Sequence, residues 1–247
     1  MGRRKRDGME KRRETETLYT VETNGVVLHY ARAGEGRPVI LLHGNGEDHH
    51  LFGTQVRQLT EAGYCVYAPD SRGHGANAPV SEFHFTDMAD DIYGFIKALG
   101  LERPALYGHS DGGIIALLLE IRHPGTLGAM AISGTNLSPD GLIPSFVEEY
   151  TEINRKKPDP LITLMLTEPH IDPATLRGID IPVLVTAGED DLILREETER
   201  IAAELPDAEM VIVPGADHGS YIVGSEVMGE MLIPFLAKRW TEGSCPA

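Results

Sequence analysis

Cysteine, aromatic residues and long apolar runs are scarce in this 247-residue chain, which has two cysteines and 6% aromatic residues. Two cysteines are too few for a secreted domain held together by disulfides, so we expect a cytoplasmic protein with Cys65 in its core. No run approaches the roughly 18 apolar residues that cross a membrane, so we expect no spanning segment. The low aromatic content predicts that any binding pocket is built mostly from aliphatic side chains.

Positive charge is also scarce, because 22 lysines and arginines face 38 acidic residues and the formal net charge is −16. A phosphate backbone or an anionic membrane attracts a basic face, so this balance argues against nucleic-acid and membrane partners. The exception is residues 1–13, with seven basic and two acidic side chains. Such a run can bind nucleic acid or membrane, but its composition favours a disordered basic arm over residues 1–17.

The rest of the chain alternates between predicted strands and predicted helices. Extended runs at 18–23 and 26–32 flank Asn24-Gly25, which is typical of a β-hairpin. Unbroken apolar runs then predict parallel strands covered on both faces, with helical apolar spacing between them. These strands are expected at 39–42, 64–68, 104–107, 128–132, 182–187 and 210–213, and a closing helix at 221–239. The order predicts one α/β domain over residues 18–240, with a mostly parallel, doubly wound sheet and a tail at 241–247.

One segment, at about 136–180, interrupts this alternation. It lacks strand character, contains six prolines and has short apolar helical pieces at 146–153 and 161–166. A long connection in a compact domain usually serves as a lid or a binding element. We therefore predict a small helical cap over the carboxyl edge of the sheet. The cap residues Leu161, Leu164 and Met165 fit a substrate pocket or the cap's own packing face equally well.

The sequence Gly108-His109-Ser110-Asp111-Gly112-Gly113 lies between a predicted strand and a predicted helix. A strand-to-helix turn this sharp strains the serine and requires small neighbours around its backbone. The serine hydroxyl would stand at the N-terminus of the helix, where partial positive charge suits a developing oxyanion. Ser110 is therefore the candidate nucleophile.

A serine hydroxyl needs a general base to become a good nucleophile. Of the ten histidines, only His218 follows both Ser110 and the last predicted strand, so it is the candidate base. The acid that orients this histidine should follow a late strand. Glu189, Asp190 and Asp191 all stand at that point, and the residues alone leave the choice among them open.

Two backbone N–H groups are expected to stabilise the oxyanion. One is that of Asp111, directly after the nucleophile, and the other comes from the loop after strand 39–42, for which we predict Asn45. His49, in the next run of the chain, is a candidate pocket-wall residue. That run, Glu47-Asp48-His49-His50, also looks like a set of metal ligands. Adjacent histidines at a helix start point in different directions and no complementary set stands nearby, so we expect no metal.

Five motifs in order resemble the α/β-hydrolase superfamily over about residues 18–240. They are the His-Gly-Asn-Gly run at 43–46, the Asp-Ser-Arg-Gly-His-Gly run at 70–75, the serine turn at 108–113, and the runs at 188–191 and 215–218. The resemblance implies the α/β-hydrolase fold and a serine, histidine and acid triad that needs no cofactor. In this superfamily the acid usually lies three residues after the glycine of the fourth motif, which selects Asp191. The 70–75 run is usually structural, and Asn77 stands where many members have serine.

The turn at Ser110 is similar to that of small carboxylesterases and amino-acid ester hydrolases. We therefore predict hydrolysis of a small or medium carboxylic ester through an acyl-enzyme on Ser110. A C–C bond hydrolase or a lyase would use the same triad, and its anionic substrate would need Arg or Lys in the pocket. The cap offers only Arg155, Lys156, Lys157 and Arg177, which look solvated. A non-catalytic small-molecule receptor is the alternative of another class, and the oligomeric state is left open.

Overall fold

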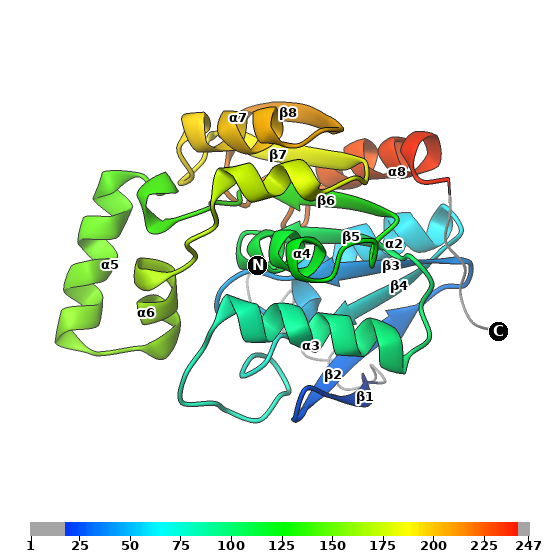
Figure 1. The fold of residues 1–247 in the computed structure, drawn as a ribbon, viewed down its shortest axis with the longest axis horizontal. Helices are drawn as coiled ribbons and strands as arrows, with labels where there is room; N and C mark the ends of the chain where they lie inside the picture. The colour runs from blue at the N-terminus through cyan, green and yellow to red at the C-terminus, as the bar shows by residue number, and fades with distance from the viewer. Residues whose placement is uncertain (1–17, 242–247) are drawn as a thin grey trace, which may run out of the picture.

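The computed structural model describes residues 18–241 as an open eight-stranded sheet between two layers of helices (Figure 1). The strand order is β1-β2-β4-β3-β5-β6-β7-β8. Strands β4, β3, β5, β6, β7 and β8 pair in parallel, whereas β2 is antiparallel to both β1 and β4. The predicted mostly parallel sheet with an N-terminal antiparallel hairpin is confirmed. The predicted basic arm and residues 242–247 of the tail lie outside the described residues.

The strands alternate with helices along the chain after the first hairpin. The strands are β1 (Leu18–Thr23), β2 (Val26–Ala33), β3 (Arg37–Leu42), β4 (Tyr64–Pro69), β5 (Ala105–His109), β6 (Ala129–Ser133), β7 (Val183–Asp190) and β8 (Ala208–Asp217). The α-helices are α2 (Gly53–Glu61), α3 (Phe85–Ala98), α4 (Asp111–Arg122), α5 (Pro144–Lys156), α6 (Pro160–Thr167), α7 (Arg195–Glu204) and α8 (Val227–Arg239). Short 3₁₀ turns are η1 (His49–Phe52), η2 (Pro139–Gly141) and η3 (Pro173–Gly178). Among these helices of the described chain, none is long and apolar enough to cross a membrane.

The hairpin that opens the sheet forms where the Asn-Gly pair predicts it. Asn24 has φ 45° and Gly25 has φ 77°, so both central residues occupy the left-handed region that a two-residue hairpin turn of the favoured type requires. The pairing of Thr23 with Val26 then fixes the register of β1 against β2. This register places Leu28 and Tyr30 of β2 in the core.

The central strands bury both of their faces, which explains their unbroken apolar sequences. In β3, Ile40 and Leu42 join one core with apolar residues of α3, α4 and α7, while Val39 and Leu41 join the other core with residues of α2 and α8. The same alternation in β4 buries Cys65 in the first core, as predicted. The two helical layers thus cover both faces of the sheet and leave the ends of the strands uncovered.

Helix α8 is shorter than its apolar sequence predicts. It begins at Val227, six residues after the predicted start at 221, because Gly224 has φ 65° and ends a preceding turn. Tyr221 and Ile222 are buried in the core from this turn rather than from a helix. Burial of an apolar residue is therefore a poor guide to where a helix begins.

The segment between β6 and β7 places α5 and α6 side by side, away from the sheet and its covering helices (Figure 1). Both helices begin with a proline at the first position, where the missing N–H has no intrahelical partner to lose. Helix α6 is anchored by Leu164, which is 2% exposed and belongs to the main core, whereas no residue of α5 is buried. The two helices are thus held to the body in different ways.

Candidate active site

Ser110 occupies a sharp turn between β5 and α4. Its φ of 53° and ψ of −118° are strained for a residue with a side chain, at about 1–3 kcal/mol. The neighbouring glycines are required: a Cβ at Gly108 would lie 2.2 Å from the carbonyl oxygen of Gly112, and one at Gly112 would lie 2.1 Å from that of Leu42. The N–H of Ser110 donates to the carbonyl of Ser133 in the adjacent strand at 2.8 Å. These contacts hold the serine at the carboxyl edge of the sheet.

His218 and Asp191 meet at the same edge, in the segments that follow β8 and β7. His218 Nδ1 and Asp191 Oδ1 lie 2.6 Å apart. The Asp191 carboxylate is 2% exposed and also accepts hydrogen bonds from the N–H groups of Gly188 and Ile193, each at 3.0 Å. Burial alone would raise the pKa of Asp191, but the bonds from His218 and the two N–H groups outweigh it and lower the pKa. The acid is therefore held in its charged form beside the imidazole.

The other two carboxylates that the sequence left open point elsewhere. Asp190 is exposed and pairs with Asp217 as the last residue of β7, and exposed Glu189 accepts the N–H of Gly215 at 2.8 Å. The register shift between Gly188 and Asp190 is what turns Asp191 inward. This irregularity of the strand could not be predicted from the sequence.

Two residues beside His218 were not predicted. A Cβ at Gly134, where φ is 56°, would lie 2.5 Å from His218 Cε1, so only glycine leaves room for the imidazole. The ring of His109 lies 4.8 Å from that of His218, centroid to centroid. Burial, and secondarily the neighbouring His218, lowers the pKa of His109 to about 3, so this second ring stays neutral. A glycine two residues after the predicted buried strand at 128–132 was the available signal for Gly134.

The loop after β3 lies against the serine turn. A Cβ at Gly44 would lie 3.1 Å from Ser110 Cβ, and the N–H of Gly44 donates to the Glu47 carboxylate at 2.9 Å. The Asn45 side chain amide donates to Asp111 Oδ2 at 2.9 Å and to the carbonyl of Leu161 in α6 at 3.2 Å. Asn45 thus joins the two candidate oxyanion segments to each other and to the cap.

A cavity of about 250 Å³ opens onto the serine and the histidine. The part of its lining that concerns the chemistry is Gly44, Asn45, Ser110, Asp111 and His218, and the remainder is largely apolar. From the cap, Phe146 and Tyr150 of α5 and Ile162 and Met165 of α6 reach it. The structure therefore brings Ser110, Asn45, Asp111 and His218 to one cavity, with Asp191 behind the histidine.

Of the four pocket residues that the sequence suggested, only Met165 lines this cavity within the described chain. Leu164 faces the main core instead, and Leu161 reaches the site only through its carbonyl. Helix α6 is rotated so that Ile162 and Met165, three residues apart, face the cavity. The rotation follows from the anchoring of Leu164, which apolar spacing alone does not reveal.

The titratable side chains of the cavity, apart from its two histidines and Tyr150, are the carboxylates of Glu47, Asp111 and Glu168. Burial raises the pKa of Glu47, and it raises the pKa of Asp111 to about 7. No Lys or Arg lines the cavity among the described residues. Glu47 and Glu168 were not predicted, because an acidic residue in a loop usually faces solvent.

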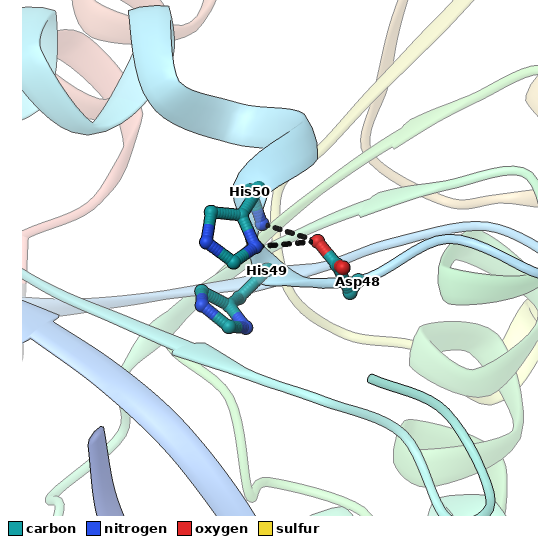
Figure 2. Close-up of side chains that lie close together, drawn as sticks. All are labelled: Asp48, His49 and His50. Atoms are coloured by element: carbon teal, nitrogen blue, oxygen red, sulfur yellow. Dashed lines mark hydrogen bonds and ion pairs between the residues drawn. The ribbon is translucent and has the colours of Figure 1, made fainter. Parts of the chain in front are cut away.

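His49 does not line the cavity either, because its N–H and its Nδ1 contact Asp70 Oδ1 at 2.9 and 2.7 Å. Figure 2 shows the Asp48 carboxylate facing His50 instead, at 2.9 Å from its N–H and 2.8 Å from its Nδ1. The ligand atoms of these three side chains lie within 4.8 Å of one another, a spacing that a cation could bridge. Each Nδ1 is engaged by a carboxylate, however, and Asp48 caps the turn η1. These contacts account for the cluster as local structure.

Asp70 and Asn77 hold the loop that the superfamily resemblance treats as structural. Asp70 is fully buried and its Oδ2 also accepts the N–H of Ala76 at 2.9 Å. The Asn77 amide donates to the carbonyls of Asp70 and Ser71, and its oxygen accepts the N–H of His29. The asparagine that departs from the usual serine therefore ties this loop to β2.

Comparison with known proteins agrees with this geometry. A family model described as alpha/beta hydrolase fold matches residues 37–159. The chain is 26% identical to serine hydrolase BPHL of Homo sapiens, over 89% of this chain and 86% of that one. An esterase from Thermogutta terrifontis superposes with a TM-score of 0.75 at 23% identity, over 91% of this chain and all of that one. The meta-cleavage product hydrolase of Pseudomonas fluorescens IP01 also reaches 0.75, at 18% identity, over 89% and 97% of the two chains. Both structural likenesses establish the fold alone.

Proposed function

Because the chain belongs to the α/β-hydrolase superfamily, we propose that it is a serine hydrolase that cleaves a small or medium carboxylic ester through an acyl-enzyme on Ser110. The observation that carries the proposal is the 2.6 Å contact between His218 and Asp191 at the cavity that Ser110 lines. We assign His218 as the base and Asp191 as the acid that orients it. The low cysteine content supports a cytoplasmic location for this activity.

The reaction follows from these roles. Ser110 Oγ attacks the ester carbonyl while His218 Nε2 takes the hydroxyl proton, and the tetrahedral oxyanion is bound by the N–H groups of Asn45 and Asp111. His218 then gives its proton to the departing alcohol, which leaves an acyl group on Ser110. Water attacks this acyl-enzyme with His218 again as base, and the acid is released. Asp191 stays charged throughout and stabilises the imidazolium.

The cap, which we propose spans about residues 136–180, limits the size of the substrate. A cavity of about 250 Å³ lies below the usual range of roughly 300–1,000 Å³ for ligand pockets, which supports a small or medium ester. The joint made by Asn45 between the serine turn and α6 supports a cap that is part of the site.

The charge of the cavity argues against the two rivals that use the same triad. A C–C bond hydrolase or lyase with an anionic substrate needs a cationic side chain, and the described lining offers carboxylates instead. Three cap cations are exposed and paired outside the cavity: Arg155 and Lys156 with Glu152, and Arg177 with Glu204. Lys157 is exposed as well. A non-catalytic receptor is disfavoured because binding alone does not require a charged carboxylate such as Asp191 paired with His218 at the cavity.

Hydrolysis of p-nitrophenyl esters from acetyl to dodecanoyl tests the proposal. We expect turnover by the native protein to fall to background in Ser110→Ala, and a short acyl chain to be preferred. A fluorophosphonate probe should label the native protein at Ser110 and leave the variant unlabelled. Equal inertness of both proteins in both assays would reject ester hydrolysis and favour the C–C hydrolase, lyase or receptor.

A further inference from the structure

Helix α5 carries apolar side chains that the rest of the protein covers only in part. None of its residues is buried, although Phe146 and Tyr150 are partly shielded. Its neighbour α6 is fastened by Leu164, which lies in the main core. Helix α5 packs against α6 but has no such anchor, so its two aromatic side chains are not required by the buried core.

These two aromatic side chains stack on each other at the cavity. Phe146 and Tyr150 are four residues apart on one helical face, their ring centroids are 4.2 Å apart and their planes differ by 25°. Both line the cavity that Ser110 and His218 also line. The chain contains only 15 aromatic residues, namely six Phe, eight Tyr and one Trp, so a stacked pair at the cavity uses a scarce residue type.

We propose that Phe146 and Tyr150 form a subsite for a flat aromatic group of the ester, so that the substrate is an aryl-bearing ester; this rests on the proposed serine hydrolase function. Two rings stacked on one helix offer a ring face or edge to a third ring, and aromatic rings prefer such offset or edge-to-face contacts. Met165 of α6, which also lines the cavity, adds a thioether that makes favourable contacts with aromatic ring edges. The carboxylates Glu47 and Glu168 in the same lining disfavour an aromatic group that carries a negative charge.

Matched ester pairs test the subsite. Benzyl acetate and cyclohexylmethyl acetate place a flat or a puckered ring in the alcohol, and methyl phenylacetate and methyl cyclohexylacetate do the same in the acyl group. We expect the native enzyme to prefer the flat ring in at least one pair, which also identifies the side of the bond that meets α5. In Phe146→Ala and Tyr150→Ala, kcat/KM for the flat member should fall about two- to tenfold, mainly through KM, with a smaller change for the puckered member.

Two variants on the same helix serve as controls. Ile153→Ala removes an apolar side chain that is 40% exposed and outside the cavity lining, so the preference should not change. Phe146→Leu keeps apolar bulk without the ring, and should lose the preference for the flat ring while turnover of the puckered esters persists. Because α5 buries no residue, all four variants should keep the native melting temperature to within a few degrees.

Binding to the inert Ser110→Ala protein separates this proposal from the proposed function. Titration of that protein with the four esters by calorimetry should show tighter binding of a flat-ring ester, and Phe146→Ala in the same background should abolish the difference. An unchanged ratio of flat to puckered binding in that double variant, or no preference in the first place, would overturn the subsite. Turnover that survives Ser110→Ala would instead overturn the hydrolase mechanism and leave the binding result to stand.

Discussion

Asp111 should destabilise the folded protein at neutral pH, and Asp111→Asn should remove that destabilisation. Burial raises the pKa of this carboxyl from 3.8 to about 7, even with the hydrogen bond from Asn45. Above about pH 4 the unfolded chain ionises Asp111 while the folded protein keeps it neutral, so the free energy of unfolding decreases with pH until about pH 7 and then stays constant. A shift of about 3 pKa units corresponds to about 4 kcal/mol in total.

Urea unfolding of the native protein and of Asp111→Asn between pH 5 and pH 8 measures this contribution. The variant keeps a side chain oxygen for Asn45 but cannot ionise. Its free energy of unfolding relative to native should therefore increase by about 2 kcal/mol between pH 5 and pH 7 and level off by pH 8. Asp180→Asn, at an exposed carboxylate, controls for the loss of one negative charge from a chain of net charge −16. If the free energy of unfolding of Asp111→Asn relative to the native protein stayed constant or decreased with pH, the reasoning would be refuted.

Three further substitutions, one of them a control, test the arrangement around His218. Asp191→Asn should lower kcat about 10⁴-fold with little change in KM, because the amide cannot hold the required tautomer of His218 or stabilise the imidazolium. The control Asp190→Asn should keep kcat within about threefold of the native value, and steady-state ester hydrolysis measures both variants. Gly134→Ala places a methyl group 2.5 Å from His218 Cε1 and should lower kcat at least 10²-fold, while an unchanged circular dichroism spectrum shows that the variant is folded. An active Gly134→Ala enzyme would mean that the imidazole works from another position.

The sheet and the position of the serine could be predicted because they depend on local sequence. An Asn-Gly pair sets the hairpin, and buried parallel strands need apolar residues on both faces, so their runs are unbroken. The turn at Ser110 needs glycine on both sides for steric reasons that any sequence with this turn must satisfy. Asp191 was selected by resemblance, and only the register shift at the end of β7 shows why the preceding carboxylate points outward.

The lining of the cavity could not be predicted, because it depends on how separate elements rotate against one another. The burial of Leu164 turns Ile162 and Met165 toward the cavity, and the sequence of α6 gives no sign of this choice. Glu168, after the end of α6, lines the cavity. Its carboxylate also accepts a hydrogen bond from the N–H of Phe85 at 3.1 Å. Long-range contacts of this kind leave no periodic pattern in the sequence.

The absence of buried residues in α5 has a consequence for how the protein can change over generations or in a directed-evolution library. Substitutions at exposed positions usually alter stability by less than about 0.5 kcal/mol, so α5 can vary with little penalty for folding. The same helix supplies part of the cavity wall through Phe146 and Tyr150. A library restricted to α5 should therefore yield folded variants with altered selectivity far more often than one restricted to α6, where Leu164 ties sequence to stability.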